Sequence, residues 1–315
     1  MYLIRGIQNI DLYLSKYKDV ELIATIGNFD GLHLGHQHII KNMQQDAVQN
    51  NWQTLVIFTE PHAKEFFAEA LGTEEKKPPR IFPWPEKVKR LKELDVDFSF
   101  FLNFNNQLRN MTPEDFIRQV LSRLSIKKIV IGDDFRFGAN REGDYNFLKS
   151  WGKENGILVE NTETFEVNGE RVSSTRIRDS LIAGNFSDAK ELLGKPYTFC
   201  GNVVYGQQLG TQLGVPTANL WLPKNKLPIA GVYIVNVDLD DKKYGGIANM
   251  GTRPTVDGQN PVLEVHILEF SGNLYGKKIR VEFLKKVRDE KKFDGLEALK
   301  EQIFEDISSA KEYFS

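Results

Sequence analysis

Three of the five histidines in the chain fall within positions 33–38, in a loop rich in glycine. His33 and His36 are three residues apart, so at the start of a helix their rings can point to the same side. The glycines let the backbone approach a ligand closely, and the N-terminus of a helix favours phosphate. Two imidazoles beside such a terminus can donate hydrogen bonds to the charge that builds on a phosphate in transfer. The loop is therefore a candidate phosphate-transfer site.

Two other interpretations of these histidines stay open. The spacing of His33, His36 and His38 is compatible with a metal site, although zinc sites normally add acidic or thiolate ligands in a defined geometry. The three side chains could also be solvated loop histidines with no function. The full string from Gly27 to His36, GNFDGLHLGH, is much more specific than the histidine pair alone.

A second glycine-rich segment covers residues 201–219, GNVVYGQQLGTQLGVPTAN. Its glycines can expose consecutive N–H groups to phosphate, and they are Gly201, Gly206, Gly210 and Gly214. Pro216 stiffens the chain just before Thr217 and Asn219, which share one side of an extended chain. A hydroxyl and an amide oxygen, with waters and nucleotide phosphates, suit Mg²⁺. The alternative is a barrel turn in which Thr217 and Asn219 satisfy backbone groups.

The elements that must position these residues alternate in the first half of the chain. Strand-like apolar runs occur at residues 22–26, 55–58, 98–102, 129–131 and 157–159, with helical patterns between them. This alternation predicts an α/β, Rossmann-like domain whose parallel sheet is covered on both faces and binds ligands at the carboxyl ends of its strands. The helix expected over residues 35–50 places one set on a single face: Ile39, Ile40, Met43, Ala47 and Val48.

The pattern changes after about residue 186. Strand-like runs then follow one another, at residues 198–205, 231–238, 243–249, 262–270 and 279–287. Only the last 20 residues have a helical pattern. Consecutive strands with one terminal helix predict an antiparallel β-barrel domain. We expect two domains, residues 1–186 and 187–315, as the length of 315 residues also indicates.

The composition excludes several classes of protein. A formal net charge of −2 argues against a general nucleic-acid binder. Cys200 is the only cysteine, which rules out an internal disulfide and fits a reducing cytosol. The first residues lack the apolar core of a signal peptide, and no apolar run approaches the roughly 18 residues that span a bilayer. We therefore expect a cytoplasmic protein that contacts neither membrane nor nucleic acid.

The histidine loop resembles the G-x-F-D-G-x-H-x-G-H signature of the bacterial bifunctional riboflavin kinase/FMN adenylyltransferases, the FAD synthetases. Two further segments match in order, Gly132–Gly138 (GDDFRFG) and Ser173–Arg178 (SSTRIR). The resemblance implies that the first domain transfers an adenylyl group from ATP to FMN and makes FAD and pyrophosphate, with His33 and His36 in catalysis. It also implies a set of nucleotide-binding residues: Gly27, Phe29, Asp30, Gly31, Asp134, Ser173, Ser174, Thr175 and Arg176.

The residues of the third segment agree with that role. Ser173 to Thr175 can cap a helix while its free N–H groups meet phosphate oxygens. Arg176 and Arg178 are two apart and cannot both face one way on a helix, so phosphate contact is assigned to Arg176, and Arg178 could pair with an acid. The alternative is a capped surface helix with two solvated arginines.

The second glycine-rich segment resembles the G-x-P-T-A-N motif of riboflavin kinases. Residues 263–270 (LEVHILEF) resemble the strand that carries their catalytic glutamate. Side chains alternate along a strand, so Glu264 lies on the opposite face from Leu263 and Val265. Glu264 is therefore the expected general base, with Glu269 facing the other way.

The resemblance also implies ligand contacts in the second domain. The ATP loop would use Gly206, Gly210, Gly214 and Pro216. Thr217 and Asn219 would hold Mg²⁺, and Arg288 and Phe293 would contact the flavin. Two departures from the family pattern touch binding: Ala63 follows His62 where proline is usual, and Thr211 stands where a basic residue is common.

The sequence thus predicts two ATP-dependent steps on one chain. Riboflavin would be phosphorylated to FMN with release of ADP, and FMN would then be adenylylated to FAD with release of pyrophosphate. Two alternatives stay open: a flavin sensor that binds FMN or ATP without turnover, and an H-x-G-H transferase for another phosphorylated substrate with the barrel as an accessory.

Overall fold

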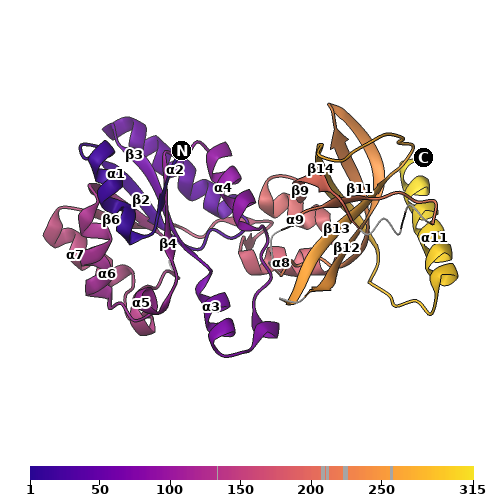
Figure 1. Cartoon of the computed structure of the whole chain (residues 1–315). Helices are drawn as coiled ribbons and strands as arrows, with labels where there is room; N and C mark the ends of the chain where they lie inside the picture. Colours follow the sequence, from indigo (N-terminus) through magenta and orange to yellow (C-terminus); the bar gives the residue numbers. More distant parts are fainter. Residues whose placement is uncertain (133, 207–209, 211–212, 223–225, 256–257) are drawn as a thin grey trace. The chain divides into compact units, whose positions relative to one another are not determined.

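The computed structural model describes residues 1–132, 134–206, 210, 213–222, 226–255 and 258–315; for residues 253–255 and 258–260 it describes the backbone alone. The chain forms two compact units (Figure 1). The first contains residues 1–78 and 84–173, and the second contains residues 79–83 and 174–315. Among the described residues, no helix is both long and apolar enough to cross a membrane.

The first unit is built on a six-stranded sheet whose neighbouring strands are all parallel. The strand order is β1-β4-β3-β2-β5-β6. The strands are β1 (Tyr2–Arg5), β2 (Leu22–Ile26), β3 (Gln53–Glu60), β4 (Phe98–Asn103), β5 (Ile126–Ile131) and β6 (Leu158–Asn161). The predicted parallel sheet is confirmed, and the five expected strands are joined by β1 at one edge.

Helices cover both faces of this sheet, which explains why β2 is buried along its whole length. On one face lie α1 (Ile10–Tyr17), α6 (Pro113–Gln119) and α7 (Tyr145–Asn155). On the other lie α2 (Leu34–Asn50) and α4 (Trp84–Glu93). One detail of the prediction for α2 is wrong: Ile40, Met43 and Ala47 are buried, but Val48 is 85% exposed because it has turned past the buried stripe.

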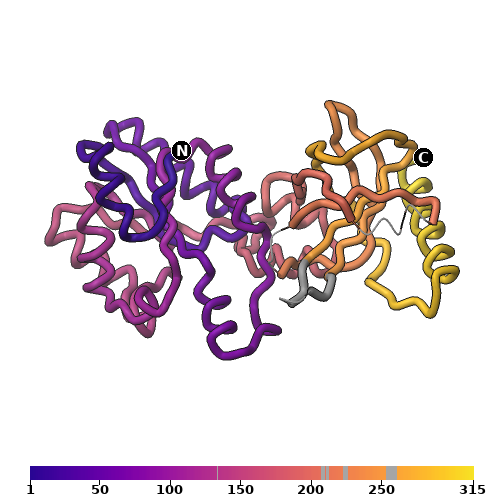
Figure 2. Tube along the Cα trace, viewed as in Figure 1, coloured from indigo at the N-terminus to yellow at the C-terminus, as the bar shows by residue number. Residues whose placement is uncertain are grey.

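Shorter elements complete the first unit. The chain between β3 and α4 makes a long excursion that carries α3 (Ala63–Ala70), drawn in purple in Figure 2. Helix α5 (Asn106–Arg109) follows β4, and a small hairpin forms from β7 (Glu166–Val167) and β8 (Glu170–Arg171). This hairpin leads to Ser173, the last residue of the unit.

The second unit is a closed antiparallel barrel in the order β10-β13-β12-β11-β14-β9, as predicted. The strands are β9 (Thr198–Val204), β10 (Ala218–Leu220), β11 (Gly231–Leu239), β12 (Lys242–Thr255), β13 (Gly258–Ile267) and β14 (Lys278–Arg288). The helices are α8 (Ser174–Ile182), α9 (Phe186–Leu193) and the expected C-terminal helix α11 (Leu296–Phe314). Helices α8 and α9 belong to the same compact unit as the barrel.

Helix α11 packs against one face of the barrel wall. Its Ile307 and Ala310 are buried against Val232, Ile234 and Ile247 of strands β11 and β12. The contact is also polar, because Arg288 of β14 donates to both carboxylate oxygens of Asp306, with Nη2–Oδ2 at 2.7 Å and Nε–Oδ1 at 2.9 Å. Asp306 is 4% exposed, so this pair anchors the helix from inside the interface.

Candidate active sites

The order of strands in the first unit locates its ligand crevice. The chain runs from β2 outward through β3 to β4, and then returns to place β5 on the other side of β2. In open parallel sheets, ligands bind at the carboxyl ends of the strands at such a reversal. The loop after β2 begins at Gly27, and the loop after β5 begins at Gly132. The two glycine-containing motifs therefore meet at the switch point of the sheet.

The loop after β2 has a strained backbone. Phe29 and Leu32 have φ values of 48° and 46°, and Gly31 has a φ of 82°. Side chains other than glycine pay about 1–2 kcal/mol in this left-handed region. Both strained residues are almost fully buried, as is Asp30 between them. The sequence places large apolar residues where the conformation is costly, so the surrounding structure must hold the loop in shape.

His33 ends this loop and caps α2. Its Nδ1 accepts a hydrogen bond from the backbone N–H of His36 at 3.4 Å, which leaves Nε2 as the protonated nitrogen of a neutral His33. The rings of His33 and His36 stack with centroids 3.7 Å apart and an interplanar angle of 18°. The structure thus brings together the two imidazoles that the sequence predicted to act together.

His36 is held in its neutral form. Its pKa lies well below the usual 6.5, first because burial disfavours the charged ring, and then because of the charges of His33 and Lys87. Its Nδ1 is buried and has no hydrogen-bond partner. A buried polar atom without a partner is costly and is typical of functional sites. A neutral imidazole can still donate one hydrogen bond to a phosphate oxygen.

His38 does not share this arrangement. It is exposed, its Nε2 lies 3.1 Å from the Nδ2 of Asn42, and its ring packs at 5.2 Å from the ring of Phe165. Two stacked rings and a third ring directed elsewhere do not converge on one ion. The geometry therefore disfavours the metal interpretation of the three histidines.

Other segments of the first unit converge on the same place. Asp134, in the loop after β5, lies 3.5 Å from Arg171 of the β7–β8 hairpin in an exposed ion pair. A Cβ on Gly35 would contact the Cβ of Phe165 at 3.7 Å, and the N–H of Val172 donates to the carbonyl of Phe165. Ser173, which follows directly, is therefore near the N-terminus of α2. Asp133 lies outside the described residues.

Ser174, Thr175 and Arg176 begin α8 and belong to the second unit. Arg176 pairs with Asp188 of α9 through a 3.1 Å contact, and Asp188 also accepts from Ser180. Arg178 donates to the carbonyl of Pro79 at 2.8 Å. Arg176 thus has an acid partner on α9. The acid partner that the sequence suggested for Arg178 stays a prediction. The assignment of phosphate contact to Arg176 stays a prediction.

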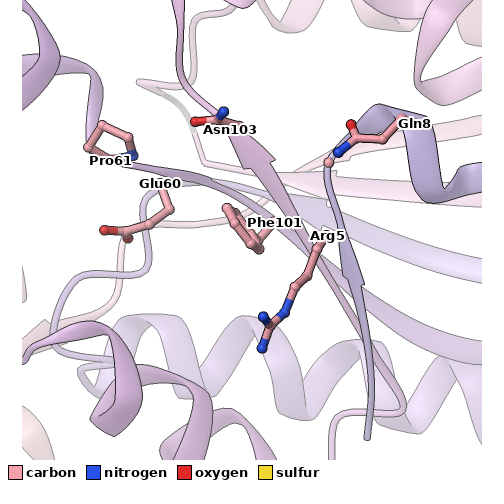
Figure 3. A pocket seen from close by; sticks show the side chains of 7 residues that line it. Arg5, Gln8, Glu60, Pro61, Phe101 and Asn103 are labelled. Carbon is pink, nitrogen blue, oxygen red and sulfur yellow. The ribbon is translucent and has the colours of Figure 1, made fainter.

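A cavity of about 390 Å³ opens at the carboxyl ends of β1, β3 and β4 (Figure 3). It combines an aromatic ring and a proline with several polar groups, and its lining is Arg5, Gly6, Gln8, Glu60, Pro61, Phe101 and Asn103. The volume falls within the usual range for small-molecule sites. His62, whose role the sequence left open, caps the adjacent α3 by accepting from Lys64 N–H and thus has a structural task.

The candidate site of the barrel is formed by residues that neighbouring strands present on the same face of the sheet. Asn219 of β10 pairs with Glu264 of β13, Glu264 with Asn249 of β12, Asn249 with Val232 of β11, and Val232 with Arg288 of β14. Side chains of directly paired residues point to the same side of a sheet. Leu263, Val265 and Ile267 are buried on the opposite face, as the alternation predicted. The register therefore places Glu264, Asn219 and Arg288 in one row.

The glycine-rich segment passes closely over this row. A Cβ on Gly206 would lie 2.5 Å from the side chain of Asn219, and one on Gly210 would lie 3.3 Å from Oγ1 of Thr217. His266 Nδ1 donates to the carbonyl of Pro216 at 2.9 Å, which fixes the end of the segment on β13. Gly214 has a φ of 81°, which suits glycine. Thr211 lies outside the described residues.

The oxygen atoms beneath this segment fit a divalent cation of the magnesium type. Thr217 and Asn219 offer a hydroxyl and an amide oxygen, and Glu264 offers a carboxylate in the neighbouring register position. Within the described ranges, no group of three or more His, Cys, Asp or Glu residues could hold a metal ion. Mg²⁺ at this place would depend on waters and nucleotide phosphates for most of its ligands, which is its common behaviour.

Arg288 and Phe293 lie at the other end of the row. The guanidinium of Arg288 is 5.7 Å from the ring centroid of Phe293 and is paired with Asp306. The sequence suggested both residues as flavin contacts, and the structure adds that Arg288 fastens α11 to the barrel. Glu290 is close to Gly251, where a Cβ would collide with its carboxylate. Only the folded register reveals that closeness.

The sequence alone did not point to two buried charged residues beside the first site. Lys87 and Arg90 of α4 are 3% and 2% exposed. Lys87 Nζ donates to the carbonyl of Asn28 at 2.9 Å, and Arg90 Nη1 donates to the carbonyl of Gly31 at 3.0 Å. Charged residues on a helix are usually solvated. The signal in the sequence is that Lys87 and Arg90 are three residues apart, on the same side of the helix as the apolar Leu91.

Comparison with known proteins gives a family for each part of the chain. Residues 15–176 match the family model of FAD synthetase, and residues 193–314 match that of riboflavin kinase. The bifunctional riboflavin kinase/FMN adenylyltransferase of Pseudomonas fluorescens is 40% identical over 313 residues, which cover 99% of this chain and 97% of the relative. That of Escherichia coli K12 is 41% identical over 316 residues, covering 100% and 98%.

A solved structure gives the same picture of the fold. A protein from Streptococcus pneumoniae described as a macrolide-efflux protein superposes with a TM-score of 0.75 and 28% identity, over 99% of both chains. Taken together, the two domains and their motifs define a two-site flavin and nucleotide enzyme. The chain belongs to the family of bifunctional riboflavin kinase/FMN adenylyltransferases. Its activities are ATP-dependent phosphorylation of riboflavin and adenylylation of FMN.

Proposed function

We propose that the barrel phosphorylates riboflavin on the face that carries Glu264, and that FMN is adenylylated at the switch point of the parallel sheet. The observation that carries this assignment is that the catalytic residues proposed for the two steps lie in different units. His33 and His36 stack in one unit, while Glu264, Asn219 and Arg288 share one row in the other.

In the barrel, Glu264 takes the proton from the 5′-hydroxyl of riboflavin as that oxygen attacks the γ-phosphate of ATP. The phosphoryl group moves to riboflavin, and ADP leaves. Strands lie about 4.8 Å apart, so Arg288 is roughly 14 Å along the wall from Glu264. A ribityl chain followed by a three-ring flavin is of that length. Riboflavin would therefore extend from Glu264 toward Arg288 and Phe293.

The nucleotide would occupy the other end of the row. Gly206, Gly210, Gly214 and Pro216 form the segment over Asn219 and would follow the phosphates with backbone N–H groups. Thr217 and Asn219 would hold Mg²⁺, which neutralises charge on the transferring phosphoryl group when it is bound.

In the first unit, the phosphate of FMN attacks the α-phosphate of ATP, and pyrophosphate leaves. The nucleophile is already an anion, so no protein base is required. His33 and His36 donate hydrogen bonds to the charge that develops on the α-phosphate. Gly27, Phe29, Asp30 and Gly31 shape the loop around it, and Asp134 and Ser173 approach from neighbouring segments of the same unit. The assignment of Ser174, Thr175 and Arg176 to nucleotide binding rests on the family resemblance of their segment alone.

The cavity beside Phe101 is our proposed place for the flavin ring of FMN. It lies at the end of β4, two strands from β2, which is roughly 10 Å at the usual strand spacing. A ribityl phosphate arm covers that distance. Phe101 and Pro61 offer apolar contact, while Arg5, Glu60 and Asn103 offer polar groups for the ring edge.

Two coarser features belong to the same proposal. Cys200 is the single cysteine of the sequence, so an internal disulfide cannot form, which fits a reducing cytoplasm as the place of the reaction. The proposed domain boundary at residues 186 and 187 lies between the two family models, which end at residue 176 and begin at residue 193, whereas the compact units divide earlier, after Ser173.

A time course tests the proposal. Purified protein is incubated with riboflavin, ATP and Mg²⁺, and the flavins are separated by chromatography. We expect FMN first and FAD later, and EDTA in excess should stop FMN formation. FMN without FAD, even under reducing conditions, would remove the assignment of the first unit, and bound flavin without any conversion would favour a sensor.

A further inference from the structure

Two buried cations of α4 hold the loop between β2 and α2, which carries the candidate phosphate site. Lys87 and Arg90 lie one turn apart on α4, and each donates to a carbonyl of the loop between β2 and α2. The carbonyl of Asn28 immediately precedes Phe29, and the carbonyl of Gly31 immediately precedes Leu32. Each cation therefore holds the peptide unit next to a residue with positive φ.

This coincidence has a physical reason. A left-handed backbone at Phe29 and at Leu32 persists only when its surroundings over-determine it. Charge-assisted hydrogen bonds are stronger than neutral ones, and they gain strength in a buried place. Burying a lysine and an arginine costs free energy, and the hydrogen bonds to these two carbonyls offset part of that cost. The same two hydrogen bonds hold the loop in its strained shape.

Lys87 is also close to the histidine pair. Its ammonium lies 5.0 Å over the ring of Phe58, and its charge acts on His36 together with that of His33. The titratable groups facing His36 are thus His33 from the loop and Lys87 from α4, with Asp30 buried in the same loop. A fixed positive charge at Lys87 favours the neutral form of His36.

We propose that Lys87 and Arg90 are positioning residues for adenylyl transfer, which hold the strained loop so that His33 and His36 face the reacting phosphate. Neither residue contacts substrate in this role, since both are buried behind the loop. The inference rests on the proposed function of the first unit and extends it to residues of α4.

The test compares Lys87→Met with Lys87→Arg and with Lys89→Met. Lys89 is a matched control because it is on the same helix but its side chain is 37% exposed and pairs with Glu86 and Glu93. Small displacements of a reacting geometry cost about 100-fold, so Lys87→Met should lower kcat for FAD formation on that order. Lys87→Arg should recover most of the rate, and Lys89→Met should stay within about twofold of the parent.

The pH dependence of FAD formation distinguishes a positioning role of Lys87 from a role in stability alone. Without the ammonium, the pKa of His36 rises, so the acid limb of FAD formation in Lys87→Met should move to higher pH. Lys87→Arg keeps the charge and should keep the limb. FMN formation in the same molecules should be unchanged, which distinguishes a failure of this inference from a failure of the two-site assignment.

A second variant guards against loss of folding. Arg90→Lys keeps the charge but has a shorter side chain without the guanidinium that reaches the carbonyl of Gly31. It should lower FAD formation about threefold to tenfold while the unfolding temperature stays near that of the parent. FAD formation at the parent rate in both Lys87→Met and Arg90→Lys would overturn the proposal. So would an equal loss of FMN and FAD formation in variants that remain folded.

Discussion

The two candidate sites are built by opposite means. In the barrel, Asn219, Glu264 and Arg288 are fixed by the hydrogen-bond register of the strands on which they stand. In the parallel-sheet unit, the functional groups stand on a loop with two strained residues, and buried cations of a separate helix hold that loop. Regular structure positions a site for little cost, whereas a loop needs dedicated supports.

This difference has a chemical counterpart. The kinase step needs a base in line with a hydroxyl, and a strand face can present one. The adenylyl step needs donors around a phosphate, and a loop that leads into a helix exposes its N–H groups for that purpose. This difference between the two sites predicts how substitutions lower activity. In the barrel, a substitution should act by removing one functional side chain, and in the loop it should act by altering the shape of the backbone.

The largest expected effect concerns the base of the kinase. Glu264→Gln keeps the size and the register position but cannot take a proton, so FMN formation should fall by about 10²–10⁴. Adenylylation of added FMN should continue at the parent rate. Glu269→Gln is the control, because Glu269 is exposed in the turn that follows β13 and lies outside the row. Both activities are measured by chromatography of the flavins.

A Glu264→Gln variant that still makes FMN would remove Glu264 from the mechanism. Loss of both activities in a folded protein would show that the barrel and the parallel-sheet unit do not divide the work as proposed.

A smaller effect concerns the ion pair between Arg288 and Asp306, which joins α11 to the barrel. Asp306→Asn removes the buried partner of Arg288, and breaking such a pair costs about 3 kcal/mol in the free energy of unfolding. Asp289→Asn is the control, since Asp289 is exposed and pairs with Lys286 at the surface, so its unfolding midpoint should be unchanged. Urea unfolding of the barrel measures both.

If Asp306→Asn unfolds at the same urea concentration as Asp289→Asn, the pair does not fasten α11, and Arg288 is free for a role in binding alone.

The smallest effect is a dependence on pH. His36 has a pKa well below 6.5 in the folded protein and an ordinary one when unfolded. Between those two values the unfolded chain binds a proton that the folded one does not, so stability falls as the pH drops below about 6.5. FAD formation should remain level from pH 8 to below pH 6.5, because His36 stays neutral. A rate that declines already near pH 7 would contradict this.

The sequence indicates the geometry of the barrel row more completely than that of the loop, for a physical reason. Alternation along a strand has a period of two, so the face of Glu264 follows from counting residues. That Arg288 joins the same row depends on the pairing of β11 with β14, which no local pattern contains. The glycine loop was recognised from its residue types, but its strain depends on φ values at Phe29 and Leu32 that a sequence does not show.

Charged residues were the hardest to place. Lys87 and Arg90 have the polarity of a solvated helix face, yet the fold buries them because the loop supplies carbonyl partners. Arg176 pairs with Asp188 of α9, a partner that the local pattern of α8 does not contain. Such pairings arise between elements distant in sequence, and they become visible only in the fold.

The central claim is that two independent sites share one chain, and a mixing experiment tests it most directly. His36→Ala should convert riboflavin only to FMN, with His38→Ala as its control, and Glu264→Gln should leave riboflavin unchanged. Mixed in one tube with ATP and Mg²⁺, the two variants should together make FAD from riboflavin. Failure of the mixture to make FAD, when each variant is folded and keeps its remaining activity, would contradict the account.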